Sequence, residues 1–164
     1  THYQITMAPI DGLSIGADYI EVDDTTAAGV VSNDKIDNGS VYVKYTTGPV
    51  SVGVGETRTS TPSTKSSTAT IQGYENKSFD ISYAVNDNLS LSFQQEASVR
   101  NETTLLQGTR ADADTGKKST QQTLMAAYTV GGATLGFTMI DVEDSDYTKG
   151  KKETLSLFTV EMAF

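Results

Sequence analysis

The sequence predicts an all-β chain, an antiparallel up-and-down sheet of about nine strands that forms part of a transmembrane β-barrel. Three observations lead to this prediction. Apolar and polar residues alternate with a period of two along most of the chain, whereas the 3.6-residue period of helices is hard to find. Tight turns alternate with long polar connections, as in the hairpins of such barrels. The chain also ends on an alternating apolar segment that closes with Phe164.

Composition excludes several other classes of protein. The 164 residues fit a single domain, and a net charge of −9 has the wrong sign for a nucleic-acid partner. The chain has no Cys and one His, His2, which leaves almost nothing for a zinc site or a Ser-His-Asp triad, so we expect no enzymatic activity. No stretch approaches the roughly 18 apolar residues of a membrane-spanning helix, although this does not exclude a barrel.

The strands are expected as four hairpins followed by one closing strand. In chain order the hairpins cover residues 3–19, 41–54, 79–99 and 124–139, and the closing strand covers 158–164. Each strand has apolar side chains at alternate positions, which places them on one face of the sheet. Gly, Asn and Asp, which tolerate the backbone angles of tight turns, stand at the hairpin centres.

The two faces of the predicted sheet differ in chemistry. In the third hairpin, Phe79, Ile81 and Tyr83 lie on one face, and Asp80 and Ser82 lie on the other. The polar face consists mostly of Ser, Thr, Gly, Gln and Asp, which suits a water-filled lumen. Tyrosines near strand ends fit the aromatic girdles at the membrane interfaces. By alternation alone, a soluble β-sandwich whose apolar faces pack together is an equal alternative.

The connections favour the barrel over the sandwich. Outer-membrane barrels have short turns on the periplasmic side and longer loops on the extracellular side, an asymmetry that a soluble sandwich does not need. We expect one barrel domain over residues 1–164. Its tight turns are expected near 11–12, 48–49, 87–88 and 131–132, and its long loops near 23–39, 57–74, 101–118 and 143–152.

The end of the chain carries an independent signal. Phe158, Val160, Met162 and Phe164 alternate with other residues up to the last position. This pattern resembles the C-terminal strand signal of Gram-negative outer-membrane proteins, which the barrel-assembly machinery reads. The resemblance implies that this machinery and membrane lipid are partners and that the protein resides in the bacterial outer membrane.

The chain also resembles the general porin family of Gram-negative bacteria, notably its alpha-proteobacterial members. The resemblance is carried by strand-turn-strand segments at 7–19, 41–45 and 83–91. It implies a roughly sixteen-stranded barrel, a homotrimer, and a water-filled channel for the passive diffusion of small hydrophilic solutes and ions. The alternative function is that of a non-channel cell-surface β protein, such as an adhesin or a surface-lattice subunit.

Strand parity indicates that further strands complete the barrel. A bacterial barrel with an even strand number and both termini in the periplasm has a long loop as its first connection. Here the first connection is the tight turn at 11–12. We therefore expect these strands to be the C-terminal part of a larger barrel, completed by the same gene product or by a second chain. The resemblance places the family's constriction loop in the earlier half.

Charged residues on the wall of the lumen are expected to set its ion preference. Lys44, Arg58 and Arg100 are the candidate wall cations, and the alternative for Arg58 and Arg100 is that they only solvate the rim. The charged residues expected to line the pore by alternation are Asp18, Lys44, Glu56, Arg58, Asp80, Glu96, Arg100 and Glu161.

Two acidic loop segments are candidates for a calcium site. Asp112 and Asp114 in one segment, and Asp144 and Asp146 in the other, offer the closely spaced carboxylate oxygens that Ca²⁺ binds. Neither segment has the full EF-hand spacing, so the alternative is a solvated acidic loop. Apart from this candidate, we expect no metal and no cofactor.

Overall fold

A computed structural model describes residues 1–23, 35–65, 69–106, 109–111 and 117–162 of the chain. Its strands form one sheet in the order β1-β2-β3-β4-β5-β6-β8-β9-β10, and the short β7 pairs with β6 off this path. The strands are β1 (His2–Met7), β2 (Leu13–Asp23), β3 (Lys35–Thr47), β4 (Val50–Lys65), β5 (Ala69–Ala84), β6 (Leu89–Leu106), β7 (Thr109–Ala111), β8 (Lys117–Val130), β9 (Ala133–Glu143) and β10 (Lys152–Met162). A short 3-10 helix, η1 (Ser145–Tyr147), lies between β9 and β10. Within these ranges, no helix has the length and apolar character needed to cross a membrane.

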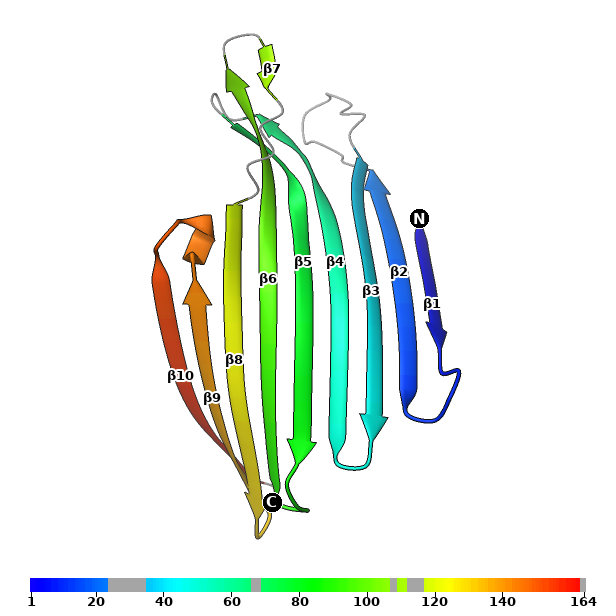
Figure 1. Ribbon diagram of the computed structural model, residues 1–164, viewed down its shortest axis with the longest axis vertical. Coiled ribbons are helices and arrows are strands. Elements are labelled where there is room, and N and C mark those ends of the chain that lie inside the picture. The colour runs from blue at the N-terminus through cyan, green and yellow to red at the C-terminus, as the bar shows by residue number, and fades with distance from the viewer. Residues whose placement is uncertain (24–34, 66–68, 107–108, 112–116, 163–164) are drawn as a thin grey trace.

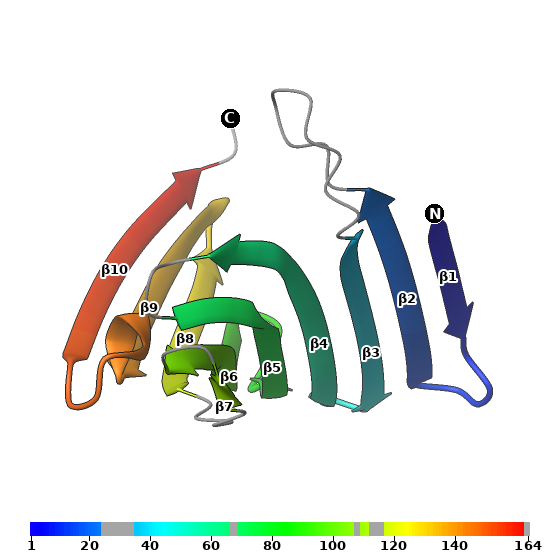
Figure 2. The same cartoon turned by 90° about the horizontal axis from the view of Figure 1, so that it is seen from above.

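Each pair of neighbours on the nine-strand path is antiparallel, which confirms the predicted all-β, up-and-down fold. The sheet is curved, with β1 and β10 as its two edges (Figures 1 and 2). At the lower end of Figure 1, short connections join β1 to β2, β3 to β4, β5 to β6 and β8 to β9. At the upper end, β4, β5 and β6 extend beyond the other strands.

Two of these strands occupy most of the segment expected as a loop at 57–74. β4 continues to Lys65 and β5 begins at Ala69, so the Ser/Thr-rich run that suggested a loop lies mainly in strand. The physical reason is that a strand above the membrane needs no apolar core, because its partner strand satisfies its backbone and its polar side chains. The side-chain amide of Asn76 donates to the hydroxyl of Thr57 at 3.1 Å, for example, and Thr favours extended backbone.

Two of the other expected loops are also shorter in the structure, whereas the loop expected near 143–152 agrees with strands that end at Glu143 and begin at Lys152. β6 runs to Leu106 and pairs with β7, so much of the expected loop at 101–118 is strand. β3 begins at Lys35, inside the expected loop at 23–39. The sheet therefore extends past the apolar part of the strands on this side.

The register separates an apolar face from a polar face. Directly paired residues of antiparallel strands project from the same face. One row of paired residues across β2 to β9 is apolar: Leu13, Tyr45, Val52, Ile81, Phe93, Leu124 and Met139. The next row, on the opposite face, carries polar residues or glycine from β2 to β8: Ser14, Lys44, Gly53, Asp80, Gln94 and Thr123.

No layer of the described chain covers the apolar face. None of the hydrophobic side chains in the described ranges is buried, and Val41 and Val160 remain 55% and 54% exposed. A soluble sandwich would bury these side chains against a second sheet. The exposed apolar face is instead what a barrel presents to lipid.

The apolar face forms a belt that crosses the strands obliquely. On β1 the belt is centred at Ile5, and the row of paired residues that starts at Ile5 ends at Lys152 on β10. On β10 the belt is centred at Val160, eight residues further along. An offset of about eight residues, each about 3.3 Å, over about eight strand spacings of about 4.8 Å gives a tilt of roughly 35°. Strands of outer-membrane barrels tilt by roughly 35–45°, so the belt would lie level in a membrane.

The polar face is the concave one. Side chains crowd on the inside of a curved sheet and spread apart on the outside. On the polar face, the ring of Tyr42 fills the space above Gly16, and the carboxylate of Asp80 fills the space above Gly53. Gly16 and Gly53 are buried, whereas residues of the apolar belt are widely exposed. The curved sheet therefore presents an apolar outer surface and an inner wall that is mostly polar from β1 to β8, with Ile140, Leu155 and Leu157 as apolar residues on β9 and β10.

Candidate functional site

The candidate functional site is the polar inner wall. The register places six of the expected pore-lining residues on this face: Asp18, Lys44, Asp80, Glu96, Arg100 and Glu161. They come from β2, β3, β5, β6 and β10 and so span the width of the sheet. Both signs of charge are present, spaced by small polar residues.

The remaining two residues, Glu56 and Arg58, lie on the apolar face, which corrects their expected position. Glu56 pairs with Val41, and Arg58 pairs with Gly39, in rows that begin at Ile5 and Tyr3 on β1. The pairing of β4 with β3 has no register shift between Val50 and Thr59, so the face of Val54 is also that of Glu56 and Arg58. Glu56 and Arg58 therefore stay on the outer face of the sheet. Their polar side chains lie at the upper end of the apolar belt on that face.

Glu56 and Arg58 belong to a cluster that we call the outer ion cluster: Glu56, Arg58, Glu75 and Lys77. Arg58 contacts Glu56 at 2.8 Å and Glu75 at 3.4 Å, and Lys77 contacts Glu75 at 2.8 Å. The side chains of Arg58 and Lys77 are 69% and 61% exposed. These are solvated pairs of the kind that contribute little to stability.

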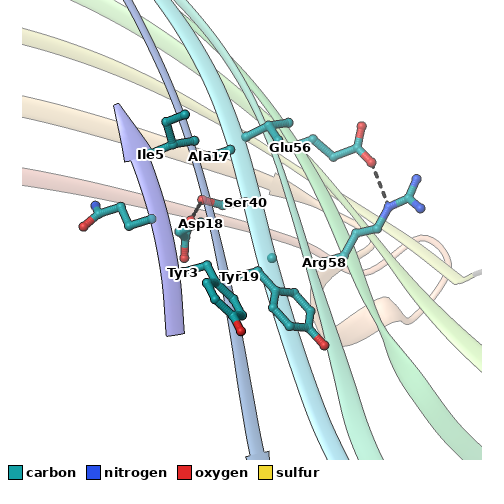
Figure 3. A pocket seen from close by; sticks show the side chains of 11 residues that line it. Tyr3, Ile5, Ala17, Asp18, Tyr19, Ser40, Glu56 and Arg58 are labelled. Atoms are coloured by element: carbon teal, nitrogen blue, oxygen red, sulfur yellow. Dashed lines mark hydrogen bonds and ion pairs between the residues drawn. The ribbon is translucent and has the colours of Figure 1, made fainter. Parts of the chain in front are cut away.

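A shallow groove lies beside the outer ion cluster, above Gly39, which has no side chain. Figure 3 shows the rings of Tyr3 and Tyr19 side by side, with the ion pair of Glu56 and Arg58 extending from β4. The hydroxyl of Tyr19 donates to Asp37 at 2.8 Å. Tyrosines and charges that meet in this way are typical of the interface between hydrocarbon and water, so the groove marks the upper membrane boundary.

The middle of the inner wall holds Lys44 and Asp80 in one row, separated by Gly53. Because Gly53 has no side chain, the carboxylate of Asp80 occupies the space above it. On β2, Asp18 accepts a hydrogen bond from the hydroxyl of Ser40. The middle of the wall thus combines charged side chains with small neighbours, Gly53 and Ser40.

The upper inner wall holds a second charged group, the inner ion cluster: Arg100, Glu102 and Lys117. The guanidinium of Arg100 lies 2.5 Å from Glu102, and the ammonium of Lys117 lies 3.1 Å from the other oxygen of Glu102. The side chains of Arg100 and Glu102 are only 20% and 10% exposed. Two cations around one carboxylate leave this cluster with a net positive charge.

Tyr147 of η1 covers the inner ion cluster. Its ring lies 4.8 Å from the guanidinium carbon of Arg100, within the range of a cation–π contact, and 5.8 Å from the ring of Tyr74. Its hydroxyl lies 2.6 Å from the hydroxyl of Ser98, which also donates to Asn76 at 2.5 Å. The connection between β9 and β10 thus folds over the inner wall.

Sequence reasoning missed Glu102, Tyr74 and Tyr147. Alternation places Glu102 on the same face as Arg100. A prediction that continued the strand beyond residue 100 would therefore have included Glu102 in the inner wall. Tyr147 has no comparable signal, because it stands 49 residues from Ser98 in a segment without periodicity.

The described residues of the C-terminal signal lie on the apolar face of the last strand, which is the face that a barrel turns toward lipid. Phe158, Val160 and Met162 project from the apolar face of β10 and are 65%, 54% and 57% exposed. Phe164 lies outside the described residues. Whether the assembly machinery reads this strand stays a prediction.

Of the calcium candidates, Asp112 and Asp114 lie outside the described residues. Asp144 accepts a hydrogen bond from the backbone N–H of Gly150 at 2.6 Å, and Asp146 forms an ion pair with Lys151 at 2.5 Å. The hydrogen bond from Lys151 lowers the pKa of Asp146. In the described ranges, no three His, Cys, Asp or Glu residues gather as a metal site would require. The arrangement of Asp144 and Asp146 fits an ordered loop.

Comparisons with known proteins support the fold. No protein-family model and no curated protein matches the sequence. Among solved structures, the chain is similar to in-vitro folded OmpT, an outer membrane protein of Vibrio cholerae, with a TM-score of 0.57 and 15% sequence identity. The match covers 96% of this chain and 51% of that chain, so the chain spans about half the length of the structure that it matches.

The fold, the oblique apolar belt and this match lead to one conclusion. The sheet is that of an outer-membrane β-barrel, and the protein resides in the bacterial outer membrane. The exposed apolar face suits contact with membrane lipid, and the two edges at β1 and β10 are where a barrel takes further strands.

Proposed function

We propose that this sheet is part of the wall of a porin-like channel, through which small hydrophilic solutes and ions diffuse passively. The observation that carries the proposal is the polar concave face, in which Asp18, Lys44, Asp80 and Glu96 pair with the small residues Ser40, Gly53 and Ser78. A water-filled lumen requires such a wall, since transmembrane barrels with a channel present polar residues inward and apolar residues to lipid. No covalent chemistry is part of this function.

Fixed charges give the channel its means of selecting ions. Lys44 and Asp80 lie in one row of the wall. An ion that passes close to this row feels the electrostatic potential of both charges with little screening by water. Because the wall has both signs of charge, a single charge reversal should shift the ion preference without closing the channel.

Closure of the barrel is part of the proposal. In a path of nine antiparallel strands, the edge strands β1 and β10 run in the same direction, so joining them directly would make a parallel pair. Unpaired strand edges are costly in hydrocarbon. We therefore propose that an odd number of further strands closes the barrel. A homotrimer, and insertion by the barrel-assembly machinery, complete the proposal on the basis of the family resemblance.

The test is ion conduction by the intact protein in planar lipid bilayers. We expect discrete conductance steps in the wild type. Lys44→Glu should shift the reversal potential in a salt gradient toward cation preference, because it reverses a charge on the inner wall. Lys77→Glu is the matched control, since Lys77 belongs to the outer ion cluster and should leave the reversal potential unchanged. A correctly inserted wild-type protein that does not conduct would overturn the proposal.

A non-channel surface protein is the second candidate, and one observation favours it. β6 continues from Phe93, at the top of its apolar belt, to Leu106, and β4 and β5 extend beside it. Such an extension would present a sheet above the membrane for adhesion. Binding of expressing cells to a surface, without conductance by the purified protein, would support this candidate.

A further inference from the structure

The connection between β9 and β10 is a folded element that reaches across the inner wall. It is anchored on β9 and β10, yet Tyr147 contacts Tyr74 on β5 and both Ser98 and Arg100 on β6. In the strand order, β8 stands between β6 and β9. The loop therefore spans β8 on the polar side of the sheet.

The loop has a fixed and strained backbone. Asp144, Asp146 and Tyr147 have φ values of 55°, 54° and 58°, in the left-handed region that non-glycine residues rarely adopt. Ser145 is 4% exposed, and its N–H donates to the carbonyl of Lys151 at 3.0 Å. Strain of this kind persists only where surrounding contacts hold it, and it is frequent at functional sites.

The loop lies at the level of the inner ion cluster, above the membrane belt. The belt on β9 ends at Met139, whereas the loop begins after Glu143. At this level the ring of Tyr147 shields Arg100 from the lumen, and the Nε atom of Arg100 is buried without a hydrogen-bond partner among the described residues. A loop that only connected two strands would not need to cover a wall cation.

We propose that the loop at 144–151 is a constriction element, which Tyr147 fastens to the inner wall, and that it narrows the lumen and screens Arg100 from passing anions. This inference rests on the proposed channel function. Tyr147 then determines both the conductance and part of the ion preference. The contacts of Tyr147 with Ser98, Tyr74 and Arg100 hold the loop against the inner wall.

The first test is Tyr147→Ala in the intact protein, measured in planar bilayers. Loss of the ring should release the loop and uncover Arg100, so single-channel conductance should rise and the reversal potential should shift toward anion preference. Adding Arg100→Gln to this variant should remove the anion shift and keep the higher conductance. Thr148→Ala is the matched control, because Thr148 is exposed in the same loop and should leave both quantities unchanged.

A second readout does not depend on conduction. Trypsin should cleave after Lys149 and Lys151 faster in Tyr147→Ala than in the wild type, because a fastened loop resists the protease. Tyr147→Phe keeps the ring but loses the hydroxyl contact with Ser98, and Ser98→Ala removes the same contact from the other side. Both should give a smaller acceleration, and they keep the test valid if the alanine variant does not fold.

The outcomes separate this inference from the proposed function. A wild type that does not conduct overturns both. A conducting wild type whose conductance and reversal potential are the same in Tyr147→Ala overturns the constriction alone. Unchanged cleavage in folded Tyr147→Ala, Tyr147→Phe and Ser98→Ala also overturns it, because Tyr147 would then not fasten the loop.

Discussion

Two ion clusters lie at a similar height on opposite faces of the sheet, and they differ in environment. In the outer ion cluster, the side chain of Arg58 is 69% exposed. In the inner ion cluster, the side chains of Arg100 and Glu102 are 20% and 10% exposed. Two features explain this difference. The inner ion cluster lies on the concave face, where side chains crowd together, and the β9–β10 loop places Tyr147 over Arg100.

The comparison shows which level of structure decides each property. Strand alternation decides the face on which a charge lies. A loop that is distant in sequence then decides whether that charge is solvated or enclosed. An enclosed ion pair depends on its partner far more than a solvated pair does.

Removing the central carboxylate of the inner ion cluster should have the largest effect. We expect Glu102→Gln to lower the free energy of unfolding by about 2–3 kcal/mol, because Arg100 and Lys117 would lose a charged partner in an enclosed site. Glu75→Gln makes the same change in the outer ion cluster and should cost much less, because water screens that cluster. Urea unfolding in lipid vesicles measures both, and equal losses would remove the distinction between the clusters.

Neutralising one arginine on each face should have a smaller effect, on ion preference. Arg100→Gln should shift the reversal potential toward cation preference, because Arg100 lies on the inner wall. The shift should be smaller than that of Lys44→Glu, since Glu102 and Tyr147 already screen Arg100. Arg58→Gln should cause no shift. A shift with Arg58→Gln but none with Arg100→Gln would mean that the two faces are assigned the wrong way round.

Acid should have the smallest effect, and the loop over the inner ion cluster is where we expect to detect it. The hydrogen bond from Lys151 lowers the pKa of Asp146 below its ordinary value of 3.8. The stabilisation of the loop by this pair is therefore present above about pH 4 and is lost as the pH falls through the lowered pKa. A spin label at position 148 should become more mobile in that range. Asp146→Asn should show the higher mobility already at neutral pH, and a wild-type label with no change on acidification would contradict this role of Asp146.

Much of the fold can be predicted from the sequence, because one face of each strand must meet lipid and the other water. The alternation around Phe79, Ile81 and Tyr83 identifies both the strand and its faces. For Glu56 and Arg58 the prediction of pore-lining residues assigns the wrong face, because counting on by twos from Val54 places both on the apolar face. Near the upper membrane boundary, position in the strand is a better guide to the face than polarity.

The loop over the inner ion cluster could not be predicted in this way. Its fold depends on contacts between residues far apart in the chain, such as Tyr147 with Ser98, and on left-handed backbone at Asp144 and Asp146. Neither has a periodic signal. The extension of β4 to Lys65 was missed for a related reason, because a Ser/Thr-rich strand paired in water looks like a loop by composition.

The central claim is that adjacent positions of one strand face lipid and an aqueous lumen. The 164 residues contain no cysteine, so a cysteine introduced into them is unique within this segment. Leu91 projects from the apolar face of β6, and Ser92 projects from the polar face. A charged, water-soluble thiol reagent should reduce the conductance of Ser92→Cys channels and leave that of Leu91→Cys channels unchanged. Reaction and block at position 91, with none at position 92, would contradict the account.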